Sequence, residues 1–291
     1  MPLTTAQAMA TFLADIITPT EKQQADVTAK RQSTGGYMAE AFPQTSDLPV
    51  KRVILIGSAA RGTLIRPVDD VDVMAEFINK DHTFEKYRND SGAFLQRIRT
   101  ALDAKTAIKG IGARGQAVRL FYVNGAHVDI APVFKWSRAG YALPSGDGGW
   151  ITTDPEAQAS WFTERKGTVG DALTGVIKLA KRWNAVHSKR MQSYHLEISI
   201  SKTFSKAGSD YRAALAKYFE WAPNNLDVED PAGHSGMLSA YLTRASREGL
   251  VNRFQEAAQR ASRAVNAEAA GNHNEAKRLW SVELGDEFPT G

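Results

Sequence analysis

Hydrophobic and polar positions follow two different patterns along this chain of 291 residues. Between residues 44 and 134, short β-branched runs alternate with turn residues, which is typical of strands. From residue 157 onward, apolar residues recur at spacings of three and four, which is typical of amphipathic helices. The two patterns predict an α+β protein in which a mixed sheet-and-helix part precedes a helical part.

The first part contains four predicted strands, VKRVILIG, DDVDVMAEF, AVRLFYV and HVDIAPVF. Asn124-Gly125 separates the last two and indicates a hairpin. Residues 82–104 have the apolar spacing of a helix. Residues 138–155 are rich in Gly, Pro, Ser and Asp, so we expect a loop and a domain boundary there.

Helical spacing also marks residues 5–32, which predict one or two helices able to pack on either part. Four later helices are predicted, over 169–187, 192–206, 209–221 and 236–283, with the loop NNLDVEDPAGHSG between them. We therefore predict three parts, namely a helical segment 1–40 bridging two lobes, a core 41–156 and a helical domain 157–291.

Composition restricts the chemistry. The chain has no cysteine, which excludes thiol catalysis, disulfides and cysteine-ligated zinc, and its histidines lack a zinc-binding spacing. Any bound metal is therefore expected to have oxygen ligands. No apolar run approaches the roughly 20 residues that span a bilayer, and the apolar start lacks the basic region of a secretory signal. We expect no membrane association and a cytoplasmic location.

The strand DDVDVMAEF carries the first candidate chemistry. Residues two apart on a strand point to the same face, so Asp70 and Asp72 place two carboxylates side by side, where they repel each other unless a cation lies between them. A lone D-x-D is more often a solvated strand edge. Here Asp129 adds a third carboxylate inside the apolar strand HVDIAPVF. Three carboxylates predict a site for two Mg²⁺ or Mn²⁺ ions of the kind used in phosphoryl transfer.

Gly57-Ser58 ends the strand before the acidic one. A glycine lets the backbone approach a phosphate closely, and the Ser58 hydroxyl and nearby N–H groups can bond its oxygens. Arg61 follows in the same turn and could also meet a phosphate, whereas Thr63 is expected to brace the strand pair. These residues predict a phosphate-binding turn beside the metal site.

The order of a GS turn, a D-x-D strand and a later Asp resembles the polymerase-β nucleotidyltransferase superfamily. GSAARGT, IRPVDDVDVM, VIKLAKRWN, QSYHLEI and LWSVELGDEFP are similar to the cGAS/DncV-like nucleotidyltransferases (CD-NTases), which are bacterial relatives of oligoadenylate synthetase. The resemblance covers most of the chain. It implies a polymerase-β-like core, an oligoadenylate-synthetase-like helical lobe and a nucleotide bound in the cleft between them.

In that family, the residues matching Lys181 and Ser193 contact the triphosphate. Without the resemblance, Lys178 and Lys181 would be surface lysines on one helix face, and Ser193 could be a helix N-cap. The predicted catalytic and metal-binding residues are Asp70, Asp72 and Asp129, and the predicted nucleotide-binding residues are Gly57, Ser58, Arg61, Lys181 and Ser193.

The resemblance implies an enzyme that joins ribonucleoside triphosphates into cyclic di- or oligonucleotide second messengers for antiphage (CBASS) signalling. One alternative is an enzyme of the same fold that modifies a small molecule, a protein or an RNA end. The balance of 36 Lys and Arg against 32 Asp and Glu disfavours an RNA track. Another is a non-catalytic nucleotide-binding regulator, which the clustered acids disfavour. A regulatory protein or nucleic acid is compatible with the sequence but not required.

Four aromatic side chains are further candidates for a chemical role. Tyr141 and Trp150 could stack on a base, but large aromatics near loops more often anchor packing, which we favour. His127 and His195 are expected to be hydrogen-bonded structural residues, because metal-activated attack needs no imidazole base.

Overall fold

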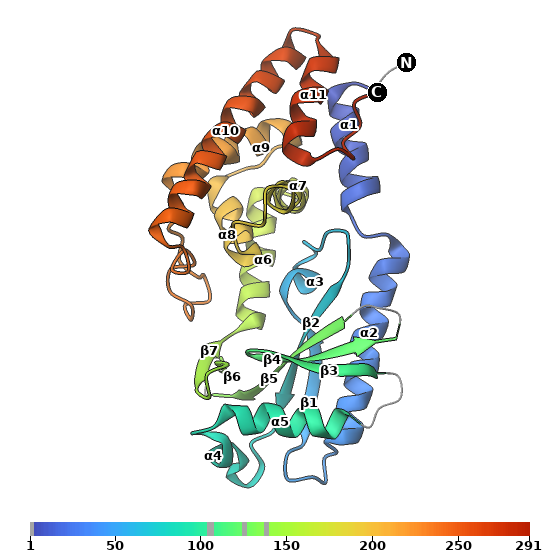
Figure 1. The fold of residues 1–291 in the computed structure, drawn as a ribbon, viewed down its shortest axis with the longest axis vertical. Helices are drawn as coiled ribbons and strands as arrows, with labels where there is room; N and C mark the ends of the chain where they lie inside the picture. Colours follow the sequence, from blue (N-terminus) through green and yellow to red (C-terminus); the bar gives the residue numbers. More distant parts are fainter. Residues whose placement is uncertain (1–2, 104–107, 124–126, 137–139) are drawn as a thin grey trace. The chain divides into compact units, whose positions relative to one another are not determined.

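The computed structural model describes residues 3–103, 108–123, 127–136 and 140–291 (Figure 1). Its contacts divide the chain into two compact units. The sheet unit comprises Pro19–Arg61 and Pro67–Ala159, and the helical unit comprises the residues up to Thr18, Gly62–Arg66 and Ser160–Gly291. Among the described residues, no helix combines the length and apolar character needed to cross a membrane.

Within its described residues, the sheet unit contains seven strands in one sheet. Their order is β1-β2-β5-β4-β3, with β6 beside β5 and β7 beside β6. The β2–β5 pair is parallel and the other pairs are antiparallel. The strands are β1 (Val50–Leu55), β2 (Asp70–Phe77), β3 (Ile108–Arg114), β4 (Ala117–Tyr122), β5 (His127–Lys135), β6 (Tyr141–Pro144) and β7 (Trp150–Thr153).

In the part of the sheet unit that the structure describes, four helices and a 3-10 turn lie wholly within the unit. They are α2 (Glu21–Ala41), α3 (Gly57–Arg61), the 3-10 turn (Lys80–His82), α4 (Thr83–Tyr87) and α5 (Ser91–Leu102). The predicted helix over 82–104 is therefore two helices. They are separate because the Asp90 side chain accepts from the Ala93 backbone N–H and caps a new helix.

Aromatic rings fill the core on one side of the sheet. Phe94 lies 4.9 Å from Phe134 and 5.2 Å from Phe77 between ring centroids, and Trp150 lies 5.0 Å from Phe84. These large rings supply much of the buried apolar area that stabilises the unit.

Two strand predictions in this unit need correction. Residues 138–155 were expected to be a loop, but β6 and β7 form an antiparallel hairpin in their described part. Tyr141 begins β6, and Ser145–Gly149 contains the turn, in which Gly146 and Gly148 have positive φ. Strand β3 was not predicted, because the glycines in IKGIGAR weaken the strand pattern. The predicted Asn124-Gly125 turn lies outside the described residues.

The helical unit is built around α7 (Ala172–Val186), whose Trp183 ring stacks on Phe254 with centroids 4.7 Å apart. The other elements are α1 (Thr5–Thr11), a π-helical turn (Phe12–Ile17), α8 (Ser193–Thr203), α9 (Tyr211–Trp221), a 3-10 turn (Ala222–Asn224), α10 (Arg244–Ala269) and α11 (His273–Leu284). Helix α6 (Pro155–Val169) crosses from the sheet unit into the helical unit. The predicted helix 236–283 is thus α10 and α11, which separate at Gly271, where φ is +77°.

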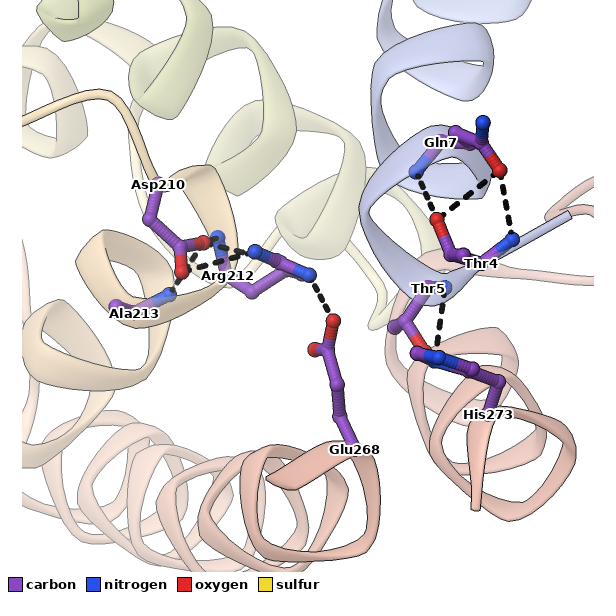
Figure 2. Close-up of polar contacts among 8 residues, drawn as sticks. All are labelled: Thr4, Thr5, Gln7, Asp210, Arg212, Ala213, Glu268 and His273. Atoms are coloured by element: carbon purple, nitrogen blue, oxygen red, sulfur yellow. Dashed lines mark hydrogen bonds and ion pairs between the residues drawn. The ribbon is translucent and has the colours of Figure 1, made fainter. Parts of the chain in front are cut away.

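Side-chain hydrogen bonds tie distant helices of this unit together (Figure 2). The Thr5 backbone N–H lies 3.3 Å from His273 Nδ1, which joins α1 to α11. Arg212, near the start of α9, forms an ion pair with Glu268 of α10 and also bonds the capping residue Asp210. The first helix therefore packs within the helical unit, whereas α2 belongs to the sheet unit. The three-part division at residues 40 and 156 stays a prediction.

Candidate active site

Two of the predicted carboxylates face each other across the parallel strand pair. Asp72 on β2 is the register partner of Asp129 on β5, and Asp70 is opposite His127. The intervening residues Val71 and Val128 are fully buried, so strict alternation directs the acidic side chains to the opposite face. Asp70 is exposed, Asp72 is half-buried and Asp129 is only 6% exposed. The strands therefore bring the three predicted acidic residues to one end and one face of the sheet.

Arg119 extends this acidic row onto a third strand. It is the register partner of Asp129 across the antiparallel β4–β5 pair. Its Nε donates to Asp129 Oδ1 and its terminal nitrogen to Oδ2, each at 2.7 Å, which is a bidentate ion pair. The hydrogen bonds that Arg119 donates to Asp129 raise the pKa of the Arg119 guanidinium, burial acts in the opposite direction, and the charges of Asp70 and Asp72 add to the rise.

The arginine determines how the third carboxylate is presented. Within the described residues, no group of three or more His, Cys, Asp or Glu side chains is arranged to hold a metal ion. Both oxygens of Asp129 already accept from Arg119. The carboxylates supply the hard oxygen donors that Mg²⁺ and Mn²⁺ prefer, but Asp129 is turned toward Arg119.

Gly57 is required by two independent features of the structure. Its φ is +62°, a conformation that L side chains rarely adopt. A Cβ built on it would lie 2.8 Å from Asp72 Oδ2, closer than any normal contact. The Ile56 backbone N–H also donates to the Asp72 carbonyl at 3.0 Å, which ties the two segments together. The absence of a side chain at Gly57 therefore leaves room for the Asp72 carboxylate.

The GS segment is a helix start rather than a turn. Gly57 and Ser58 are the first two residues of α3, and Arg61 is its last. The sequence was expected to form a turn because glycine and small residues favour irregular backbone. Gly57 and Ser58, which are predicted to bind phosphate, therefore lie in the first turn of a short helix. Arg61 is half-buried on the same short helix.

In the helical unit, Lys181 is buried in an ion pair. Its Nζ lies 3.1 Å from Glu197 Oε1 on α8 and donates to the Thr63 carbonyl at 3.0 Å. Lys181 is 8% exposed and the Glu197 side chain is fully buried. The surface-lysine interpretation is therefore wrong. Thr63 is fully buried at the start of the segment that follows α3, and its carbonyl is held by this lysine.

Ser193 is exposed and is the first residue of α8, whose N-cap is Gln192. The N-cap interpretation of Ser193 is therefore wrong, and its hydroxyl is at the first helical position. Lys178, one turn before Lys181, is half-buried and donates to Thr18 Oγ1 at 3.4 Å. Burial, followed by the charge of Lys181, lowers the pKa of the Lys178 ammonium.

Three of the four aromatic candidates have structural contacts. Tyr141 is 2% exposed and accepts from Arg52 at 2.9 Å, and Trp150 Nε1 donates to the Tyr87 carbonyl at 3.0 Å. Both side chains therefore have the structural contacts that the packing interpretation expects, and both lie in strands. His195 Nε2 lies 2.7 Å from the Leu226 carbonyl, and burial lowers the pKa of its imidazole. His195 is a structural residue, as predicted, and His127 lies opposite Asp70.

Two residues of the site were missed in the sequence. Arg119 is a charged residue within an apolar strand, but a two-residue turn at Asn124-Gly125 would have paired it with Ile130 rather than Asp129, so the sequence does not reveal this ion pair. Glu197 lies on a different helix from Lys181. Only the apolar neighbours Leu196 and Ile198 hint that its carboxylate is buried.

The chain is similar to known proteins in sequence and in fold. Residues 3–166 match the family described as the Second Messenger Oligonucleotide or Dinucleotide Synthetase domain. A Bacillus cereus (strain VD146) protein named "Probable cyclic nucleotide synthase" is 27% identical, and the match covers 82% of this chain and 83% of that protein. An Escherichia coli (strain MS 115-1) protein named "Cyclic AMP-AMP-AMP synthase" is 25% identical over 70% of this chain and 67% of its own length.

Two solved structures share the fold across nearly the whole chain. E. coli MS115-1 CdnC with ATP has a TM-score of 0.77 at 19% identity, covering 97% of this chain and 98% of that chain. Vibrio cholerae DncV cyclic AMP-GMP synthase has a TM-score of 0.78 at 15% identity, covering 98% of this chain and 96% of that chain. The predicted fold, a polymerase-β-like core with a helical lobe, is confirmed. The chain therefore belongs to the family of second messenger oligonucleotide or dinucleotide synthetases, as its resemblance to the cGAS/DncV-like nucleotidyltransferases predicted.

Proposed function

We propose that this protein uses Asp70, Asp72 and Asp129, with Mg²⁺ or Mn²⁺, to join ribonucleoside triphosphates into cyclic di- or oligonucleotide second messengers. The observation that supports this most directly is the register of β2 and β5, which pairs Asp72 with Asp129. Catalytic carboxylates on adjacent strands suit phosphoryl transfer because they hold charge at a fixed spacing beside the reacting atoms.

The residues fit a divalent cation by two criteria. First, the donors are carboxylate oxygens, which divalent cations of this kind prefer. Second, Gly57 has no Cβ, and a Cβ at this position would collide with Asp72 Oδ2. When bound, the cations would activate the attacking hydroxyl and neutralise charge on the departing pyrophosphate. Asp70 and Asp72 would hold the triphosphate side, and Asp129 the hydroxyl side. This assignment requires Asp129 to share its oxygens with Arg119.

The other predicted residues would hold the triphosphate. Gly57 allows close approach, Ser58 places a hydroxyl side chain at the start of α3, and Arg61 adds a positive charge. Lys181 and Ser193 are assigned to the same task through the family resemblance. Because Lys181 is already paired with Glu197, a phosphate would join an existing ion pair and thereby add a third partner to the ammonium.

The relatives support nucleotides as substrates and a cyclic product. The name of the E. coli relative is cyclic AMP-AMP-AMP synthase, and CdnC has been solved with ATP. CdnC has also been solved in a complex with a HORMA protein. We extend to this chain a role in antiphage (CBASS) signalling, with ribonucleoside triphosphates as substrates. We also propose a cytoplasmic location and, as an optional partner, a regulatory protein or nucleic acid.

The test is incubation of the purified protein with the four ribonucleoside triphosphates and Mg²⁺ or Mn²⁺. Phosphatase treatment and mass spectrometry then identify what resists digestion. Asp72→Asn should abolish product formation, because it removes a carboxylate from the metal site. Asp103→Asn is the matched control, since Asp103 is an exposed residue at the end of α5 and should leave product formation unchanged.

The outcomes separate the proposed reaction from its alternatives. A phosphatase-resistant cyclic product that requires Asp72 supports the proposal. Pyrophosphate release with linear products only, or transfer to an added acceptor, would instead favour an enzyme that extends a chain or modifies a molecule. Metal-dependent nucleotide binding without any product, including in the presence of a cognate regulatory partner, would favour the non-catalytic regulator.

A further inference from the structure

Arg119 completes a row of charged side chains that crosses three neighbouring strands. Asp72, Asp129 and Arg119 are consecutive register partners on β2, β5 and β4, so their side chains lie on one face of the sheet. Asp70 stands two residues before Asp72 on that face. The alternate positions Val118 and Leu120 on β4 are fully buried, so Arg119 cannot reach the apolar side without reversing the strand.

The row carries more negative than positive charge. Three carboxylates gather at this end of the sheet, and Arg119 donates two hydrogen bonds to the most buried of them. The Arg119 side chain is 20% exposed and that of Asp129 is 7% exposed, so water screens this pair less than it screens a surface ion pair. A guanidinium in this position lowers the mutual repulsion of the acids when no metal is bound.

We propose that Arg119 is a positioning residue that holds Asp129 in the metal-free protein and shares it with the divalent cation when the site fills. The proposal rests on the proposed function, because it concerns the same carboxylates. Each carboxylate oxygen has two lone pairs, so Asp129 can keep its bonds to Arg119 while it also binds a cation. The positive charge nevertheless opposes cation binding. Arg119 thus fixes the orientation of Asp129 and weakens the affinity of the site for metal.

Two substitutions separate the charge of Arg119 from its geometry. Arg119→Gln removes the charge, whereas Arg119→Lys keeps the charge but cannot reproduce the bidentate geometry. The first should lower the apparent Kd for Mn²⁺ about tenfold, because a like charge no longer repels the cation. The second should leave the Kd for Mn²⁺ within about threefold of the wild-type value. Both should lower kcat by about 10- to 100-fold at saturating Mn²⁺, because Asp129 loses its orienting partner.

The measurement is the affinity of the full chain for Mn²⁺ in the absence of nucleotide. Isothermal titration calorimetry, or the electron paramagnetic resonance signal of free Mn²⁺, gives the Kd. Arg88→Gln is the matched control, because it removes one positive charge from an exposed pair with Glu85 in the same unit. It should leave both the Kd and kcat unchanged. Mn²⁺ should also raise the Tm of Arg119→Gln more than that of the wild type, because stabilisation by a ligand grows as its Kd falls.

Several results would overturn the proposal. If Arg119→Gln binds Mn²⁺ no more tightly than the wild type does, then Arg119 does not oppose binding of the cation. If Arg119→Gln does not fold, Arg119→Lys decides, and an unchanged kcat would show that the bidentate geometry has no role. The binding comparison needs no turnover. If the wild type makes no product but Arg119→Gln still binds Mn²⁺ about tenfold more tightly than the wild type, only the proposed reaction is contradicted.

Discussion

Lys181 on α7 and Glu197 on α8 form an ion pair in which the glutamate side chain is fully buried. The same ammonium donates to the Thr63 carbonyl, just after the short helix that begins at Gly57. A cation that was predicted to meet a phosphate therefore also has a structural task. Buried charges cost free energy unless they are paired, so the two partners depend on each other.

Replacing Lys181 with Met should have two separable effects. It should lower the free energy of unfolding by about 3 kcal/mol, because the Glu197 carboxylate stays buried without that cation. It should also raise the KM for triphosphate if Lys181 contacts phosphate. Urea unfolding and initial rates measure the two effects.

The double variant Lys181→Met with Glu197→Gln is the control for stability. It removes both charges of the buried pair, so it should recover part of the lost free energy of unfolding while the KM stays high. A KM that returns to the wild-type value with the stability would show that Lys181 only holds the fold.

Replacing Gly57 with Ala should lower kcat/KM by about 100-fold, because the new Cβ would displace the Asp72 carboxylate by a fraction of an ångström or more. The positive φ should additionally cost about 1 kcal/mol of folding free energy. Steady-state rates and urea unfolding give the two values.

Gly62→Ala is the matched control. Gly62 has φ of +70°, close to that of Gly57, and a Cβ there would meet nothing within 4 Å. The two variants should therefore lose similar folding free energy, whereas only Gly57→Ala loses most of its activity. Equal losses of activity would mean that backbone strain, and not the approach to Asp72, makes Gly57 necessary.

The parts of the fold that could be predicted are those that depend on patterns among neighbouring residues. Asp70 and Asp72 were paired on one strand face because alternation is a property of neighbouring residues. The helices of the second part followed from apolar spacing in the same way. In contrast, the β6–β7 hairpin was not predicted, because its glycines are equally compatible with a loop. No local feature of the sequence distinguishes the hairpin from a loop.

The charge partners of the site depend on contacts between distant segments. Arg119 meets Asp129 only once the hairpin register is known, and Lys181 meets Glu197 only once two helices are packed. Propensity and periodicity do not contain this information, because register and packing are decided by the whole core. The sequence therefore indicated Asp129 and Lys181 but not their charge partners, Arg119 and Glu197.

Trp150→Phe tests the packing interpretation of Trp150. The Trp150 ring contacts Phe84 and Phe94, and its Nε1 donates to the Tyr87 carbonyl, so the variant should lose about 1–2 kcal/mol of folding free energy. The KM for each triphosphate should stay within about twofold, since no base is expected to stack there. Trp136→Phe is the control, because Trp136 is 44% exposed and should lose less stability. A raised KM for one base with Trp150→Phe would restore the stacking interpretation.

Glu283 on α11 should make the stability of the helical unit depend on pH. Its side chain is fully buried, accepts from Trp183 Nε1 at 2.9 Å, and forms an ion pair with Arg260. Burial alone would raise the pKa of the Glu283 carboxyl, but His187 and Arg260 outweigh burial and lower it. A lowered folded pKa means that the stabilisation is present above the unfolded pKa, near about 4.3, and is lost as the pH falls through the folded pKa.

Glu283→Gln should therefore lower the free energy of unfolding by about 1–3 kcal/mol at pH 7, and the difference from the wild type should shrink below about pH 4. Urea unfolding followed by tryptophan fluorescence across this pH range measures the difference. Glu275→Gln is the control on the same helix, because the Glu275 carboxylate pairs with Arg278 near the surface and its loss should change stability little at any pH. The free energies of unfolding of the wild type and Glu283→Gln could instead differ as much at pH 3 as at pH 7. That result would show that Glu283 stabilises the unit through the shape of its side chain rather than its charge.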